Sequence, residues 1–278
     1  MMLGEPAPTS YDLYFQLGRI PVRVHPLFWL AGVLLGSGGF RDTGLGAEIG
    51  ILLVLVWVFV FFFSILIHEM GHALTMQYYG LQPRVLLYML GGLAIADSHH
   101  GFGGYTSKAN DPRTQIIIAF AGPAAGFLFA ALLFVILHLT GVPIEFHTRS
   151  IYFWSVDWAP LFESAGDERN RKIMAMFLVH GFSSALYVNI FWGMINLMPV
   201  YPLDGGQISR HLFSMQDPVG GIVKSLWLSL FAGVALCIFG LTRQNLLMAM
   251  MFGSLAFSSY NAIQLYTGRG GYGGGRPW

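Results

Sequence analysis

Two histidines and a glutamate stand close together in the segment Ile65-Leu66-Ile67-His68-Glu69-Met70-Gly71-His72-Ala73. On a helix, residues four apart point from one face, so the imidazoles of His68 and His72 can bind the same metal ion. Glu69 can then reach a water molecule on that metal and act as its base. This His-Glu-x-x-His pattern predicts hydrolytic chemistry, with one Zn²⁺ per chain as the cofactor.

The third metal ligand has to come from elsewhere, because a catalytic zinc usually takes three protein ligands and one water. Residues 73–90 contain no further His or Glu. Asp204 is the best candidate, since it follows an apolar segment in which an ionisable group is costly unless it is paired or bound to metal. Pro199 and Pro202 end the preceding helix, and the glycines after Asp204 let the backbone turn. Asp204 can therefore point back toward the histidines.

The composition indicates whether these residues lie in water or in a membrane. Of the 278 residues, 55% are hydrophobic and only 10% are charged, whereas an average soluble domain has about 25% charged residues. We therefore expect an all-α polytopic membrane protein in a lipid bilayer. The net charge of +1 provides no basic surface for nucleic acid, so the expected substrate is a protein. Cys237 has no partner for an intrachain disulfide and is expected to be a buried apolar side chain.

Six segments approach the ~20 apolar residues that cross a bilayer. They are Pro26–Phe40, Ala47–Tyr79, Thr114–Thr140, Lys172–Met198, Ile222–Leu241 and Asn245–Leu265. The second carries the histidines in its last turns, so part of it should face protein or a water-filled cavity. No basic start followed by an apolar core appears in residues 1–10, so no cleavable signal peptide is expected.

A β-hairpin is expected between the second and third spans. Residues 84–96 favour two short apolar strands about a turn at Gly91 and Gly92. An unwound substrate could add to the edge of this hairpin as a strand; the alternative is a surface hairpin without such a role. His99 and His100 follow in a glycine-rich loop, where most histidines are simply solvated. His138 and His180 are interpreted as ordinary histidines of apolar helices.

The rest of the chain suggests one domain. Residues 1–267 are expected to form a single transmembrane metalloprotease domain, and residues 268–278 a flexible glycine-rich tail. Residues 141–171 are expected to be a loop, too short for a substantial inserted domain. With six spans, Lys and Arg are more numerous on the side of the two termini. This bias predicts cytoplasmic termini and an active site toward the cytoplasmic side.

The two motifs, in their order and spacing, resemble the site-2 protease family of intramembrane zinc metalloproteases, peptidase family M50. Gly91-Gly92, Ala121-Gly122-Pro123 and the segment Gly18–Pro26 support the resemblance, which covers nearly the whole chain. It is greatest to the small branch that includes the sporulation protease acting on a sigma-factor precursor, because no PDZ insertion is found. Many relatives have Asn at the position where this chain has Gly126, so no polar side chain acts at this position here. No cystathionine-synthase-type domain is found either, so regulation by a nucleotide through it is not expected.

The resemblance implies a mechanism and a location. Zinc held by His68, His72 and Asp204 would lower the pKa of bound water from about 15.7 toward about 7. Glu69 would take the proton and pass it to the leaving amine, and Asn196 would assist the developing oxyanion or hold the substrate backbone. Gly91, Gly92 and Pro199 are candidates for substrate binding. The expected reaction is hydrolysis of a peptide bond in or near a transmembrane segment of a membrane-bound protein, in regulated intramembrane proteolysis at a bacterial cell membrane.

Two other classes of function remain open. A membrane metal or proton transporter would use the same buried ionisable groups as a path, and a non-catalytic membrane binding partner would have lost the metal. The sequence also leaves open which protein is cut, whether an earlier cleavage precedes this one, what triggers it, and the oligomeric state.

Overall fold

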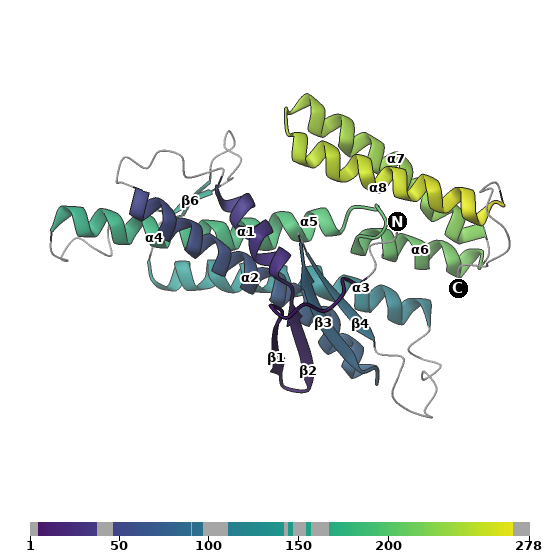
Figure 1. Cartoon of the computed structure of the whole chain (residues 1–278), viewed down its shortest axis with the longest axis horizontal. Helices are drawn as coiled ribbons and strands as arrows, with labels where there is room; N and C mark the ends of the chain where they lie inside the picture. The colour runs from purple at the N-terminus through teal and green to yellow at the C-terminus, as the bar shows by residue number, and fades with distance from the viewer. Residues whose placement is uncertain are drawn as a thin grey trace. The chain divides into compact units, whose positions relative to one another are not determined.

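Helices make up most of the chain in the computed structural model (Figure 1). It describes residues 5–37, 47–89, 91–96, 111–141, 144–146, 154–156, 167–218 and 220–268. The chain divides into two compact units, which we describe separately. The N-terminal unit comprises residues 6–104 and 121–194, and the C-terminal unit comprises residues 1–5, 105–120 and 195–278.

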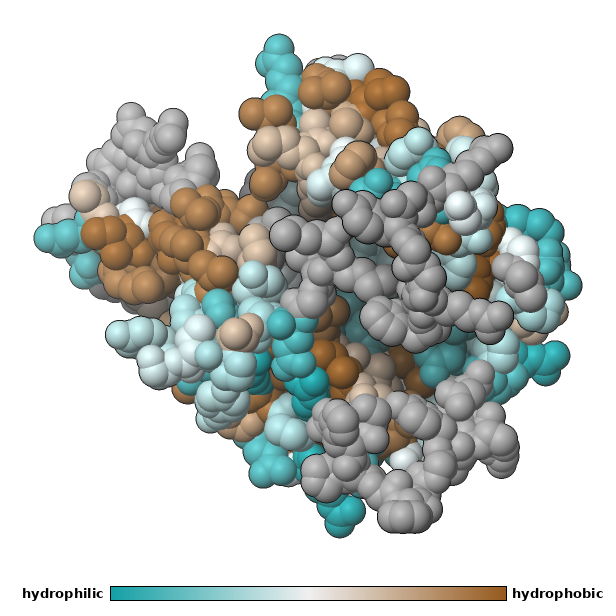
Figure 2. Space-filling view, turned by 45° about the vertical axis from the view of Figure 1, so that its right-hand side comes forward, coloured by the Kyte–Doolittle hydropathy of each residue, from teal (hydrophilic) through white to brown (hydrophobic). Residues whose placement is uncertain are grey.

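Five helices among the described residues are long and apolar enough to cross a membrane. They are α2 (Ala47–Tyr78), α3 (Pro112–Leu139), the continuous helical stretch Ile173–Asn196, α7 (Gly220–Thr242) and α8 (Leu246–Tyr266). The third stretch consists of most of α4 (Glu168–Tyr187), the π-helical turn η2 (Val188–Trp192) and α5 (Gly193–Asn196). Hydrophobic side chains cover broad areas of the surface in view (Figure 2), as lipid contact requires. The expected polytopic, mainly helical fold is confirmed.

The expected first span is described only in part, because residues 38–46 lie outside the described residues. The described part is α1 (Pro26–Ser37), a helix of 12 residues, which at ~1.5 Å per residue measures about 18 Å, against a bilayer core of ~30 Å. This helix packs on α2, where Trp57 Nε1 donates a hydrogen bond to the Gly32 carbonyl, at 3.0 Å. A Cβ at Gly36 would overlap the same indole. The cytoplasmic placement of the site stays a prediction.

A four-stranded sheet belongs to the N-terminal unit. Its order is β1 (Leu13–Leu17), β2 (Ile20–Val24), β3 (Pro83–Tyr88) and β4 (Gly91–Ala96). The outer pairs are antiparallel, whereas β2 and β3 run parallel. The predicted hairpin is therefore present as β3 and β4, but Gly91 and Gly92 lie inside β4, and the chain leaves β3 through Met89, at φ 47°. The strands β1 and β2 were not expected.

The sheet packs against α2 just before the histidine motif. Alternate residues of a strand face one side of a sheet, and here Val22, Val85 and Leu87 share one core with Phe61 and Ile65 of α2. All five are almost fully buried. Since Ile65 is three residues before His68, this core holds the sheet beside the helical turn that carries the motif.

The remaining described elements are a short two-stranded ladder in the N-terminal unit and three helices in the C-terminal unit. In the N-terminal unit, β5 (Ile144–Phe146) and β6 (Trp154–Val156) form a short antiparallel ladder within the segment expected to be a loop. In the C-terminal unit, α6 (Asp204–Gln216) contacts α7, and α7 and α8 form a helical hairpin. Glycines allow the close approach that membrane helices favour, because Gly233 faces Ala256 and Gly240 faces Ala249.

Candidate metal centre

His68 and His72 direct ring nitrogens toward each other in the interior of the N-terminal unit. Both lie on α2 and are buried, with 4% and 6% of their surface exposed. Their Nε2 atoms are 3.2 Å apart. Two nitrogens bound to one tetrahedral zinc at ~2.0–2.1 Å are separated by about 3.3 Å. The pair therefore fits two ligands of one zinc ion.

Two glycines bring α3 close to these histidines. A Cβ at Gly71 would overlap the Ala121 carbonyl, so this glycine permits close contact between α2 and α3. A Cβ at Gly122 would overlap Nε2 of His72. Gly122 therefore gives the His72 ring the space that it occupies beside α3.

Glu69 lies beside the β-hairpin. Only 5% of its surface is exposed, and a Cβ at Gly92 of β4 would overlap its carboxyl group. The preceding residue is less restricted, because a Cβ at Gly91 would meet only Trp192, at 3.9 Å. The bare backbone of Gly92 therefore lets an edge strand reach the candidate catalytic base.

The second motif lies in the C-terminal unit. Asn196 is buried at the end of α5, and Asp204 is half-buried in the first turn of α6. The loop between them folds back on α6, because Cβ atoms at Gly205 and Gly206 would overlap the backbone of residues 197–201. The amino end of a helix favours a negative charge. The turn at these glycines therefore places Asp204 at the amino end of α6, which stabilises a charged carboxylate.

Two serines hold this loop. The Tyr201 amide donates to Oγ of Ser229, at 2.8 Å, and that hydroxyl is hydrogen-bonded to Ser259, at 2.7 Å. Both serines are almost completely buried, on α7 and α8 respectively. Sequence reasoning missed them, although a serine in an otherwise apolar span is a signal of a buried hydrogen bond.

The structure therefore brings His68, Glu69, His72 and Gly92 together in the N-terminal unit. Asn196, Pro199 and Asp204 follow one another within the C-terminal unit. His99 and His100 lie outside the described residues, and His138 is exposed near the end of α3.

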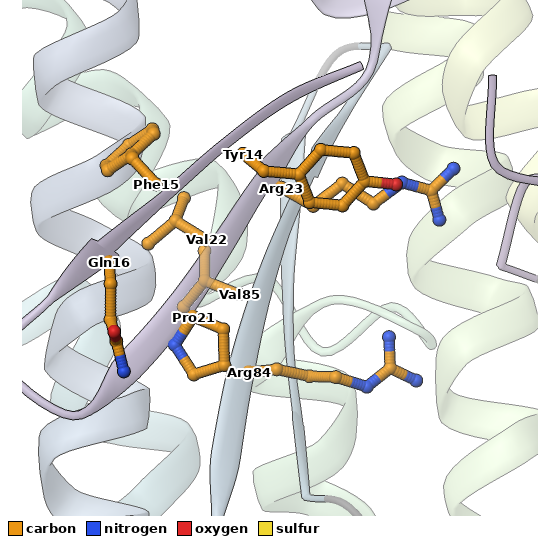
Figure 3. A pocket seen from close by; sticks show the side chains of 8 residues that line it. All are labelled: Tyr14, Phe15, Gln16, Pro21, Val22, Arg23, Arg84 and Val85. Atoms are coloured by element: carbon orange, nitrogen blue, oxygen red, sulfur yellow. The ribbon is translucent and has the colours of Figure 1, made fainter. Parts of the chain in front are cut away.

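A shallow groove of about 420 Å³ lies on the sheet. It is lined by Tyr14, Phe15, Gln16, Pro21, Val22, Arg23, Arg84 and Val85. Figure 3 shows the side chains of Tyr14, Arg23 and Arg84 extending toward the same side. None of the motif residues lines this groove, so it is not the candidate catalytic site.

Comparison with known proteins gives consistent matches. The model of peptidase family M50 matches residues 56–240. A zinc metalloprotease of Methanocaldococcus jannaschii is 23% identical over 248 residues, which are 85% of this chain and 56% of that protein. Rip3 of Mycobacterium tuberculosis is 27% identical over 149 residues, which are 53% of this chain and 28% of Rip3. The chain thus spans about half the length of the first relative and less of the second.

A solved structure has a similar fold. The site-2 protease from Methanocaldococcus jannaschii matches with a TM-score of 0.51 and 20% sequence identity. The match covers 91% of this chain and 95% of that one.

Proposed function

Because the chain belongs to peptidase family M50, we propose that it is an intramembrane zinc metalloprotease. It hydrolyses a peptide bond in or near a transmembrane segment of a membrane-bound protein. One observation carries the proposal: two buried imidazoles with Nε2 atoms 3.2 Å apart and an adjacent buried glutamate lie on an apolar helix of 32 residues. Burial of three such ionisable groups within a bilayer costs free energy unless a metal or another partner is bound.

The proposed zinc ligands are His68, His72 and Asp204, with one ion per chain. Two imidazoles and a carboxylate are a common donor set for a catalytic zinc with a fourth position for water. The first turn of α6, which favours an ionised carboxylate, supports Asp204 as the third ligand. When bound, zinc supplies a Lewis acid that makes water acidic enough to lose a proton near neutral pH.

The chain's own residues then move the proton and hold the substrate. Glu69 accepts a proton from the attacking water and delivers it to the leaving amine. Asn196 is buried at the end of α5. Its side-chain N–H donates a hydrogen bond to the substrate oxygen on which negative charge develops. Pro199 shapes the loop that follows.

The substrate binds as an extended segment along β4. In the described residues β4 pairs with β3 and occupies the end of the sheet order, so its outer edge offers backbone groups to an added strand. Gly91 and Gly92 lie on this strand, and Gly92 adjoins Glu69. A helix that unwinds onto this edge would present its peptide bonds to the base. The partners are therefore a membrane-protein substrate and the surrounding bilayer, in a pathway of regulated proteolysis.

Replacing Glu69 by Gln tests the proposal. We expect Glu69→Gln to retain zinc, because the ligands stay in place, and to lose cleavage of a single-span model substrate by at least about 100-fold, the lower range for a general base. The measurements are zinc content by metal analysis and cleavage in detergent or vesicles. Glu48→Gln is the matched control, since Glu48 lies exposed in the first turn of the same helix.

Full cleavage by Glu69→Gln would contradict the proposal. Zinc uptake into vesicles by the wild-type protein, without cleavage of any tested substrate, would instead favour a transporter that uses the same buried groups.

A further inference from the structure

His68 shares a small niche with the side chain of Asn189. The other residues that line it are Ser64, Ile65, Gly126, Val188, Trp192 and Gly193. All of them belong to the N-terminal unit, and Asn189 has only 3% of its surface exposed. The niche has no room for a water molecule. Any partner of a polar atom in it must therefore come from the protein.

The hydrogen bonds of Asn189 fix the orientation of its amide. Its Nδ2 donates to Oγ of Ser64, at 2.9 Å, and to the carbonyl of Ala185, at 2.8 Å. A carbonyl only accepts, so the amino group must face Ala185 and the amide cannot be flipped. The carbonyl oxygen Oδ1 is then left buried with no hydrogen-bond partner among the residues that the structure describes. A buried acceptor without a hydrogen bond destabilises the fold, so a donor is expected beside it.

The local backbone brings this oxygen to its position. Asn189 lies in the π-helical turn Val188–Trp192, and such turns occur often at functional sites. On the facing helix, a Cβ at Gly126 would lie 3.4 Å from Oδ1 of Asn189. This is an ordinary contact distance, so α3 lies directly beside the Asn189 amide at Gly126.

Three side chains of the niche carry a hydrogen that can be donated: Ser64, His68 and Trp192. Ser64 accepts from Nδ2 of Asn189 and therefore lies on the amino side of the amide, away from Oδ1. A histidine that binds metal through Nε2 carries its proton on Nδ1, and such a ring nitrogen almost always donates to a nearby oxygen. Because the two Nε2 atoms of the motif face each other, His68 would have this tautomer in the metal-bound protein.

We propose that Asn189 is a positioning residue for the metal centre: its Oδ1 accepts a hydrogen bond from Nδ1 of metal-bound His68. This bond fixes the tautomer that presents Nε2 to the metal and restrains rotation of the ring. The inference rests on the proposed function, since it assigns Asn189 to the zinc site named there.

Zinc affinity of the full-length protein tests the inference, measured by competition with a chromogenic chelator. Asn189→Leu keeps a side chain of similar size without the acceptor. We expect zinc affinity to fall about 10–100-fold, the usual effect of removing a group that orients a ligand. The melting temperature of the metal-free protein should change little, because removal of the unpartnered Oδ1 offsets the loss of the hydrogen bonds to Ser64 and Ala185.

Two further variants test the partner. The double variant Asn189→Ala/Gly126→Asn returns an amide to the niche from α3 and should recover part of the lost affinity. Trp192→Phe keeps an aromatic ring against Phe61 but removes the indole N–H, and should bind zinc like the wild type.

The outcomes separate the two proposals. If the wild type binds zinc and Asn189→Leu binds it equally well, the inference is overturned and the proposed function stands. A lower melting temperature of metal-free Asn189→Leu with unchanged zinc affinity would show a purely structural role and also overturn it. Weaker binding by Trp192→Phe alone would identify Trp192 as the donor, with the same result. A wild type that binds no zinc overturns the proposed function and the inference together.

Discussion

Gly122 and Gly92 control how closely neighbouring backbone approaches the motif on α2. Neither is a ligand or a base, yet a single added methyl group would overlap His72 in one case and Glu69 in the other. Interiors are close-packed, so even one extra carbon forces the surrounding atoms to move. Each glycine has a nearby glycine where the same change meets only ordinary contacts, which gives matched controls.

Gly122→Ala should weaken zinc binding by about 10-fold or more, because the His72 ring must turn away from its metal-binding position. Chelator competition measures the affinity. Gly126→Ala is the control one helical turn later, since its Cβ would approach Asn189 no closer than 3.4 Å. Equal zinc affinity in the two variants would show that the space beside His72 is not needed for metal.

Gly92→Ala should lower kcat for a membrane substrate while zinc content stays near that of the wild type. The added methyl displaces the Glu69 carboxyl, and a shift of ~1 Å in a catalytic group costs about 100-fold in rate. Gly91→Ala, which meets only Trp192 at 3.9 Å, should retain most activity. If both variants cleave at the wild-type rate, β4 does not constrain the base.

The loop that carries the second motif depends on two helices that contain none of its residues. α7 and α8 reach it through the hydrogen bonds from Tyr201 to Ser229 and from Ser229 to Ser259. In an apolar helix pair, such buried polar groups replace the hydrogen bonds that water would provide. The helical hairpin therefore supports the loop between Asn196 and Asp204 as well as crossing the membrane.

Ser229→Ala should destabilise the protein by about 1–3 kcal/mol, because it leaves the Tyr201 amide and the Ser259 hydroxyl without this partner. Thermal unfolding in detergent measures the change. Ser254→Ala is the control, since Ser254 is exposed on α8 and bonds only within its own helix. A loss of stability no larger than that of the control would mean that the serine pair does not hold the loop.

An ion pair joins the start of the chain to the sheet. Arg23 of β2 donates to the Asp12 carboxylate, at 2.6 Å, and to the carbonyls of Pro6 and Ala7. Burial of the Asp12 carboxyl acts to raise its pKa, but hydrogen bonds from Thr9 and the hydrogen bond and charge of Arg23 outweigh this and lower the pKa to about 2. Because the same sheet packs against α2, this pairing connects the first residues of the N-terminal unit to the elements around the motif.

The depressed pKa of Asp12 predicts a pH dependence. The stabilisation is fully present above the unfolded pKa, near 3.8, and is lost as the pH falls through about 2. Protection of the amides of residues 6–12 against hydrogen exchange, corrected for the intrinsic rate at each pH, should therefore fall between pH 4 and pH 2, as measured by mass spectrometry. Asp12→Asn should show low protection already at pH 4.

Asp217→Asn is the control for Asp12. Asp217 pairs with Lys224 at the surface, where both side chains are partly exposed, and such pairs contribute little. Unchanged protection of residues 6–12 across this pH range in the wild type would contradict the role of Asp12.

Some features of this protein follow from its sequence alone. The spacing of His68 and His72 determines a shared helix face, because helical periodicity is local. The location in a membrane follows from composition, because long apolar segments with few charges are stable in a lipid bilayer and not in water. The order of the two motifs sufficed to indicate the family, and Pro199, Gly205 and Gly206 indicated the turn at Asp204.

Tertiary structure decided what depends on contacts between distant segments. The sequence does not show that β2 pairs with β3 in parallel, that α1 packs on Trp57, or that Gly92 and Gly122 adjoin the motif. Nor does the sequence show that the amide of Asn189 lies beside Gly126, where a Cβ would be 3.4 Å from its Oδ1. Such contacts arise from side-chain packing across the fold, which no local pattern encodes.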